Sequence, residues 1–308
     1  MATTLTVSSN YAGKEAGAII GQSFKEADTI AKNLVTVLPD IDFQVSLRLI
    51  QYSNGRQDYA CGFTPAGAVV LAEKLLTPKK IKNEFELCKE ELRQIWSSAT
   101  MGFSAHNDSM PTDVASALNA EVLADEAAAV DMNIWQGDAT NDGEFDGFIK
   151  LFTADASIIK DGNGITAPGA ATTSSTVIAH LDLVKAAIPV KMRRKNLTWI
   201  VSPDVADAYD SALISAGVTN GLGGNANTSQ VYGRYTLETV NGLPDNTIIV
   251  YEVKNLSFGT GLLADHNELR VKDMDESDLS GQIRYKMVYT AGVQYANSGE
   301  IVWLLTTA

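Results

Sequence analysis

The residues best suited to chemistry are the carboxylates of the segment from Asp138 to Asp146. If this segment is a calcium-binding loop that starts at Asp138, oxygen-bearing side chains fill its first, third and fifth positions, and Gly143 fills its sixth. The twelfth position requires a bidentate Glu and is Ile149. We therefore expect a solvated turn, with a divalent-cation site formed by Asp138, Asp142 and Asp146 as the weaker alternative.

Two other groups of residues are less suited to a binding or catalytic role. The glycine-rich run that contains Gly221, Gly223 and Gly224 has neither the dinucleotide-binding nor the P-loop spacing, so we expect a surface loop. His106 and His266 have polar neighbours but no nucleophile motif, which favours surface histidines without a catalytic role. The sequence therefore predicts a protein that is not an enzyme and needs no cofactor.

The basic cluster at residues 191–195 (KMRRK) has two interpretations. It could contact DNA or the carboxylates of a neighbouring protein, but it also lies where a turn between a helix and a strand would be exposed. A solvated turn is the preferred interpretation, because exposed charge runs often contribute little.

Composition predicts an acidic globular protein of the cytosol. The formal net charge is −13, and no Lys or Arg occurs from Gln94 to Ile149, which disfavours tight binding to a nucleic-acid backbone. Cys61 and Cys88 form no metal-binding or disulfide pattern. We find neither a signal-peptide pattern nor an apolar run of the roughly 20 residues that a membrane span needs.

The N-terminal quarter predicts an arm followed by a long hairpin. Residues 1–11 suit an arm, and apolar residues at helical spacing predict a short helix from Ile20 to Leu34. Alternation over 43–49 predicts a strand, Asn54-Gly55 predicts a tight hairpin turn, and the return strand would run through Tyr59 and 68–76.

Further along the chain, periodicity predicts helices and then a β-rich end. We expect a helix from Asn83 to Trp96, a long helix over 113–135, and a linker at 166–176. The next expected elements are a helix over 177–188, a strand over 197–201, a helix opened by a Ser202 cap and Pro203, and strands near 247–254 and 269–274. A strand from Ile283 to Tyr295 is unusually long, which is typical of an extended, edge-spanning strand.

Three segments together resemble the major capsid proteins of tailed bacteriophages. They are Gly62–Trp96 (GFTPAGAVVLAEKLLTPKKIKNEFELCKEELRQIW), Leu197–Leu213 (LTWIVSPDVADAYDSAL), and Asn241–Leu305 with its phrases GLP, NLSFGT and AGVQY. These segments occur in the family's order and cover most of the chain after residue 60.

The resemblance implies an α+β fold of the Johnson type, as in the Hong Kong phage shell. It implies an N-terminal arm (1–38), an extended loop (39–76), a peripheral domain (77–176 and 267–293) with a spine helix at 113–135, and an axial domain (177–266 and 294–308).

The same resemblance implies assembly contacts and partners. Subunits would form hexamers and pentamers of an icosahedral shell, in contact through Asn54, Gly55 and Arg56 of the extended loop and through the glycine-rich loop at 221–224. Other implied partners are a portal, possible scaffolding or decoration proteins, and packaged double-stranded DNA in loose contact, without a membrane. The location would be the virion, after assembly in the cytoplasm of a bacterial host.

Two departures from the family pattern limit what the resemblance carries over. Some relatives crosslink through a lysine of the extended loop, but no lysine occurs here between Lys32 and Lys74, so we expect a shell without covalent crosslinks. Some relatives carry a long cleaved scaffolding segment, for which the residues before the arm leave no room, so we expect separate scaffolding or none.

Two alternatives stay open at this point. An encapsulin-type compartment shell would share most of these features and differ in what it encloses. A metal-dependent hydrolase that uses the loop from Asp138 to Asp146 would be a monomer or small oligomer, would bind a divalent ion, and would lose activity in Asp142→Ala.

Overall fold

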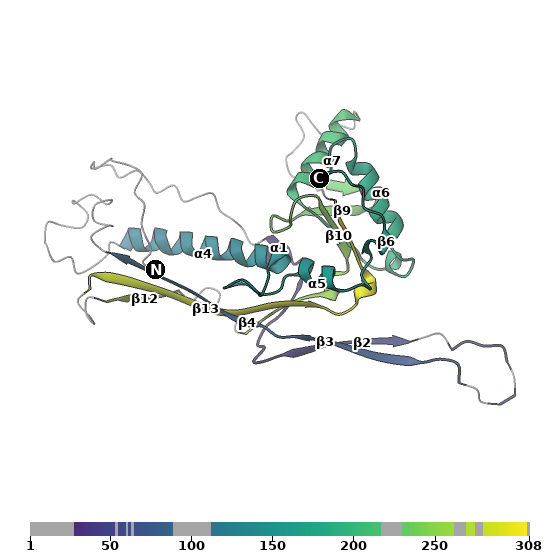
Figure 1. Ribbon diagram of the computed structural model, residues 1–308, viewed down its shortest axis with the longest axis horizontal. Helices are drawn as coiled ribbons and strands as arrows, with labels where there is room; N and C mark the ends of the chain where they lie inside the picture. Colours follow the sequence, from purple (N-terminus) through teal and green to yellow (C-terminus); the bar gives the residue numbers. More distant parts are fainter. Residues whose placement is uncertain are drawn as a thin grey trace.

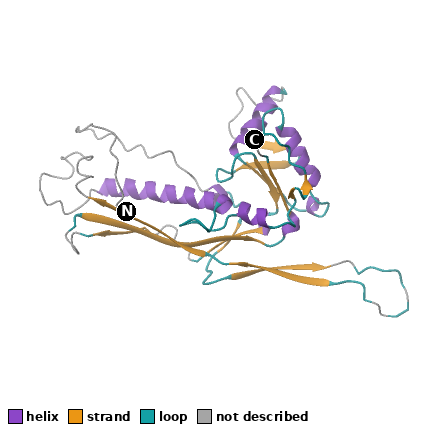
Figure 2. Ribbon diagram, viewed as in Figure 1, coloured by secondary structure: helices purple, strands orange, loops and turns teal. Residues whose placement is uncertain are grey.

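A computed structural model describes residues 28–52, 55–59, 61–62, 65–88, 112–216, 230–261, 269–274 and 280–306. The molecule is elongated: a long helix lies along a long sheet, a compact α/β unit stands at one end, and a two-stranded hairpin projects away from the sheet (Figure 1, Figure 2). No described helix combines the length and the apolar composition needed to cross a membrane.

The long sheet is built around β13 (Gln282–Tyr295). One edge of β13 pairs with β4 (Lys79–Cys88); the other pairs with β11 (Leu256–Thr260) and β12 (Leu269–Asp273), and β11 also pairs with β1 (Thr36–Leu38). Every odd-numbered residue of β13 from 283 to 295 is buried, which confirms the predicted alternation. The expectation of an edge strand is wrong, because β13 has neighbours on both edges.

Helix α4 (Thr112–Gln136) covers the buried face of this sheet, at the place predicted for the long helix. The Glu126 carboxylate joins helix to sheet: it accepts hydrogen bonds from the Tyr289 hydroxyl (2.6 Å) and the Asn83 side-chain amide (2.8 Å). At the other end of the helix, the Trp135 indole N–H donates to the Thr29 hydroxyl (2.8 Å) in the short helix α1 (Asp28–Ala31).

A second sheet forms the centre of the compact unit, in the order β14 (Ile301–Leu305), β10 (Thr247–Tyr251), β7 (Thr198–Val201), β9 (Tyr235–Thr239) and β8 (Gln230–Tyr232). Helices α6 (Val177–Ala187) and α7 (Pro203–Ser215) pack on one face of it. Strand β7, helix α6 and helix α7 confirm the predicted elements at 197–201, 177–188 and after Pro203.

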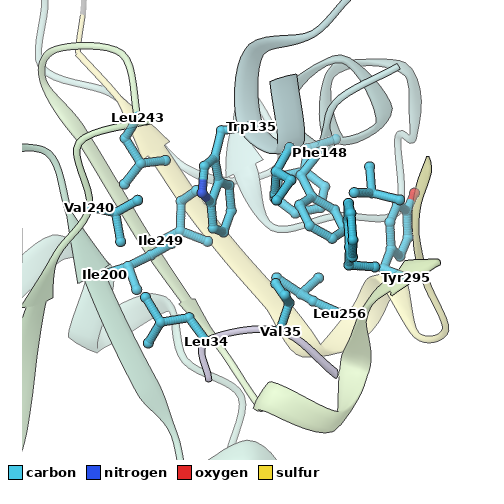
Figure 3. Packing of buried hydrophobic residues seen from close by; sticks show 14 of the residues in the cluster. Leu34, Val35, Trp135, Phe148, Ile200, Val240, Leu243, Ile249, Leu256 and Tyr295 are labelled. Carbon is cyan, nitrogen blue, oxygen red and sulfur yellow. The ribbon is translucent and has the colours of Figure 1, made fainter. Parts of the chain in front are cut away.

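Alternate residues of the second sheet enter two hydrophobic cores. Trp199 and Val201 pack under α6 and α7, whereas Ile200 points to the opposite side. There Ile200 and Ile249 join Trp135 from α4 and Phe148 from α5 (Phe148–Ala154), as Figure 3 shows. The second sheet is therefore buried on both faces, which fixes the compact unit to the end of the long sheet.

The projecting hairpin consists of β2 (Val45–Tyr52) and β3 (Val69–Leu76), which pair antiparallel along their whole length. Smaller elements complete the fold: the two-residue strands β5 (Lys160–Asp161) and β6 (Gly164–Ile165), and 3-10 turns at Met192–Arg194, Val253–Asn255 and Ser298–Glu300.

The prediction of a helix that starts at Asn83 is wrong for residues 83–88, which belong to β4; residues 89–96 lie outside the described part of the chain. Ile81, Asn83, Phe85 and Leu87 alternate with charged residues and pair with the odd positions of β13, and Phe85 stacks on Tyr285 at 4.5 Å between ring centroids. Helical and strand periods both fit so short a run, and pairing with β13 decides the outcome.

The N-terminal helix ends earlier than predicted, at Ala31 and not at Leu34. Within the described residues it spans only Asp28–Ala31, and Asn33 then takes a positive φ of 53° and turns the chain into β1, which the sequence did not predict. Residues 1–27 lie outside the described part of the chain.

Ser202 precedes α7 and Pro203 opens it, as predicted, but the Ser202 hydroxyl does not cap the helix. Instead it accepts a hydrogen bond from the Thr247 backbone N–H (3.1 Å) on the neighbouring strand. This tertiary contact replaces the expected local one.

Candidate assembly surfaces

The predicted contact residues of the hairpin are only partly described. Asn54 lies outside the described residues, and Arg56 is exposed. Tyr52 at the end of β2 pairs with Val69 at the start of β3, so the prediction that the hairpin turns tightly at Asn54-Gly55 is wrong. The predicted return strand is confirmed at Val69–Leu76, but it does not include Tyr59. A Cβ on Gly55 would lie 2.7 Å from the Gly67 backbone nitrogen, so glycine permits the two sides of the loop to approach each other here.

One face of the hairpin carries an apolar patch that the described chain leaves open to solvent. Ile50 lies opposite Leu71, and Tyr52 lies opposite Val69. Their exposed fractions are 69% for Ile50, 74% for Leu71, 67% for Tyr52 and 63% for Val69. A two-stranded hairpin is at best marginally stable alone, and contiguous exposed apolar residues mark interaction surfaces. We call these four residues the hairpin patch.

The root of the hairpin is tied firmly to the body. Leu76 is buried, and Gly259 in β11 has no side chain where Leu76 and Ile41 pack: a Cβ there would lie 2.3 Å from the Leu76 Cδ2. The Gln294 side-chain amide donates to the Leu75 carbonyl (3.0 Å). The hairpin is thus anchored at its root, whereas its far end projects free of the body (Figure 1).

A polar cluster at the same root joins Lys74, Asp155 and Tyr295. The Asp155 carboxylate lies 3.1 Å from the Lys74 ammonium and accepts a hydrogen bond from the Tyr295 hydroxyl (2.7 Å) and another from the Ser157 backbone N–H (2.8 Å). The Lys74 ammonium also lies 3.4 Å from the centroid of the Tyr295 ring. Burial raises the pKa of Asp155, but the hydrogen bonds from Tyr295, Ser157 and Lys74 outweigh it and hold the pKa well below its usual range.

The candidate cation loop contains an ammonium group among its carboxylates. Lys150 lies 2.5 Å from both Asp138 Oδ1 and Asp146 Oδ1, while Asp142 is exposed. Hydrogen bonds from Lys150 and from Thr140 lower the pKa of Asp138 well below its usual range. The described residues contain no group of three or more His, Cys, Asp or Glu side chains arranged to hold a metal ion. The geometry therefore suits a turn closed by ion pairs.

The outer face of the long sheet carries more basic than acidic side chains, although the chain as a whole is acidic. Register places two carboxylates, Glu84 and Glu86, among six basic side chains on this face: Lys80, Lys82, Arg270, Lys272, Arg284 and Lys286. Hydrogen bonds from Lys286 and Lys82 lower the pKa of Glu84 to about 2. Asp40 and Asp42 line a hollow on the same face with Lys80, Arg270 and Lys286, so two positive charges remain in excess and this face is only weakly basic.

The basic cluster at 191–195 is a turn, as the preferred interpretation states, but much of its charge is used within the chain. Lys195 bonds to the carboxylates of Glu252 (2.8 Å) and Glu300 (2.6 Å). Arg193 donates from Nε to the Ile188 carbonyl (3.0 Å) and from Nη2 to the Ala186 carbonyl (3.3 Å), which belong to the last turn and the C-cap of α6.

The histidines and the glycine-rich loop add no described site. His106, His266 and the loop at 221–224 lie outside the described residues. His180 is buried, which lowers its pKa, and it shares a hydrogen bond with the Thr172 hydroxyl (3.0 Å). That contact joins α6 to the preceding loop and is structural.

Comparison with solved structures identifies the fold. The capsid of a native GTA particle matches with a TM-score of 0.63 at 15% identity, over 92% of this chain and 90% of that one. The capsid of the Myoviridae phage XM1 matches with a TM-score of 0.58 at 10% identity over 99% of both chains, and the capsid of the cyanophage P-SCSP1u with 0.53 at 14% over 94% and 92%. The chain has a phage capsid fold. No family model and no curated protein sequence matches it.

The resemblance seen in three sequence segments is thus confirmed at the level of the fold, and the α+β class with it. The cluster around Asp155 was missed by sequence reasoning. Its partners lie 81 and 140 residues away along the chain, and neither spacing carries a local signal.

Proposed function

We propose that this chain is the major capsid protein of a tailed bacteriophage, a structural subunit that assembles into hexamers and pentamers of an icosahedral shell around the packaged genome. The capsid fold supports this proposal, and the hairpin patch carries it. A lone subunit leaves four large apolar side chains of one two-stranded ribbon in water, whereas a lattice covers them.

Burial of the hairpin patch would supply much of the contact energy. Removal of a large apolar side chain from water contributes about 1.5–3 kcal/mol, and the patch has four such side chains. Each contact of this kind is repeated in every subunit of a shell, so a modest energy per contact suffices for a stable particle.

We propose the division into domains that the resemblance implies. We assign residues 39–76 to the extended loop that overlaps a neighbour, α4 to the spine helix of the peripheral domain, and the unit of α6 and α7 to the axial domain. Asn54, Gly55, Arg56 and the glycine-rich loop at 221–224 remain proposed contacts. Genome contact would be loose, because the chain as a whole is acidic.

The test is assembly of the purified chain, followed by size-exclusion chromatography and negative-stain microscopy. Rings of five or six subunits or closed particles are the expected result. A species that stays at 33.0 kDa at high protein concentration would overturn the proposal.

A pair of variants links assembly to the hairpin patch. Leu71→Ser removes an apolar side chain at the centre of the patch, and we expect it to raise the concentration needed for assembly at least 10-fold. Met132→Ser is the matched control, because Met132 is also exposed (53%) but lies on α4, away from the hairpin. Equal effects of both variants would show that general surface hydrophobicity, and not the patch, drives assembly.

A further inference from the structure

The compact unit segregates its surface charge by element. Helix α7 has no basic residue, and its exposed residues include Asp207, Asp210 and Ile214, spaced three and four residues apart, beside Ser211 and Ser215. Asp204, at the start of the helix, accepts a hydrogen bond from the Asn246 backbone N–H (2.8 Å) and is thereby used within the chain. We call Asp207, Asp210 and Ile214 the α7 stripe.

A second surface of the same unit has the opposite charge. A hollow of about 610 Å³ lies between α6, the turn after it, and the turn that joins β8 to β9; it is lined by Asp182, Lys185, Ala186, Arg193, Arg234 and Tyr235. Its one carboxylate, Asp182, accepts a hydrogen bond from the Tyr232 hydroxyl. Three cations therefore face one carboxylate that already has a partner. We call this surface the basic hollow.

The cations of the basic hollow are held in place by the chain itself. Arg234 donates from Nη2 to the Arg193 carbonyl (3.2 Å) and to the Tyr235 hydroxyl (2.7 Å), and its guanidinium lies 4.9 Å from the Tyr235 ring centroid. The Lys185 ammonium lies 5.0 Å from the Tyr232 ring centroid. Side chains that are already ordered lose less conformational entropy when they bind a partner, so the basic hollow is preorganised to bind an anionic group.

We propose that the basic hollow of one subunit receives the α7 stripe of the next subunit in a ring. The inference rests on the proposed shell function. Because the two surfaces are different patches of one chain, their contact is head-to-tail, and a head-to-tail contact that closes makes a ring. The surfaces complement each other in charge, with the Asp207 and Asp210 carboxylates set against Lys185, Arg193 and Arg234. The exposed apolar residues Ile214 on α7 and Leu183 on α6 would meet beside them.

Charge reversal tests the contact, because like charges across an interface are strongly unfavourable. One variant carries Asp207→Lys and Asp210→Lys, and a second carries Lys185→Glu and Arg234→Glu. We expect each variant on its own to need a protein concentration about 100-fold or more above that of the wild type to form rings. Circular dichroism and thermal unfolding establish that each is folded.

The decisive measurement is a mixture of the two variants. One has two positive surfaces and the other two negative surfaces, so each face of one complements a face of the other. The equimolar mixture should recover assembly as alternating rings, and alternation allows six members but not five. Negative-stain class averages should therefore show sixfold rings without fivefold ones.

The other possible results separate failure of this contact from failure of the proposed function. Assembly of either variant alone at the wild-type concentration, or a mixture that stays unassembled while the wild type assembles, overturns the contact. Failure of the wild type to assemble overturns the proposed function itself. A pair of single variants, Asp210→Lys and Asp142→Lys, serves as the matched comparison, since Asp142 is an exposed carboxylate outside both surfaces. Equal losses of ring assembly in these two variants would also overturn the contact. If a reversed variant does not fold, Asp210→Asn and Arg234→Gln replace the reversals, with an expected loss of about 10-fold and a weaker salt dependence.

Discussion

The anchor of the hairpin can be tested by removing the Asp155 carboxylate. Asp155→Ala deletes the acceptor of three contacts, from the Tyr295 hydroxyl, the Lys74 ammonium and the Ser157 N–H. It also leaves the hydroxyl of Tyr295, a residue only 3% exposed, without that partner. A net hydrogen bond contributes about 1 kcal/mol and a buried unsatisfied group costs about 1–3 kcal/mol, so we expect a loss of about 3 kcal/mol at pH 7.

Asp155→Asn is the matched variant, because it keeps the shape of the side chain and removes the charge. Its expected cost is about 1–2 kcal/mol, since the amide oxygen still accepts the Tyr295 hydroxyl while the ion pair with Lys74 is lost. Urea unfolding of subunits kept below the assembly concentration measures both values. Hydrogen exchange should show that protection falls first in β3, next to Lys74.

The dependence on pH follows from the direction of the pKa shift. The folded chain holds the pKa of Asp155 below its value in the unfolded chain, near 3.9 for an ordinary Asp. The carboxylate therefore contributes its full stabilisation above that value and loses it as the pH falls toward the folded pKa. The difference between wild type and Asp155→Asn should shrink from pH 5 to pH 2. A cost of Asp155→Ala below about 0.5 kcal/mol, or a difference that does not change with pH, would refute this account of the anchor.

Three further outcomes are expected. Glu126→Ala should destabilise the subunit by about 2–3 kcal/mol in urea unfolding, because it removes the carboxylate that accepts hydrogen bonds from the Tyr289 hydroxyl and the Asn83 amide; Glu126→Gln should cost less than half of that. Gly137→Ala should cost at least about 2 kcal/mol in the same assay, since the new Cβ would lie 2.3 Å from the Phe145 main-chain carbonyl, which cannot move aside. Denaturing gels of assembled particles should show one monomer band and no ladder, because the only lysine of residues 39–76 is held in the ion pair at the hairpin root.

Local periodicity was a good guide where one face of an element is buried along its whole length. The strand β13 and the helices α6 and α7 could be predicted because their buried residues repeat with the period of the element. It failed at residues 83–88, a run short enough to fit either period. Pairing with six residues of β13 settled that case, and no property of the run itself reveals this pairing.

Of the candidate sites, one could be predicted from its local sequence and another depends on tertiary packing. The turn at 138–146 was expected from its own residues, because Asp and Asn side chains bond to nearby backbone groups and Gly143 adopts a positive φ (81°). The ion pair between Lys150 and Asp146 joins residues four apart in the sequence, so local spacing could also have predicted it. By contrast, the basic hollow combines side chains from α6, a 3-10 turn and the β8–β9 turn, and only the packing of α6 against the second sheet brings them together.

The sequence by itself predicted the long strand, the long helix and the acidic composition of the chain. Each of these follows from composition or from a short-range period, and so needs no partner. Tertiary structure decided that β4 is a strand, that Asp155 anchors the hairpin, that the hairpin patch stays in water, and that opposite charges gather on two surfaces of one unit. Those features depend on contacts between residues far apart in the chain, and such contacts exist only once the sheets and helices have packed.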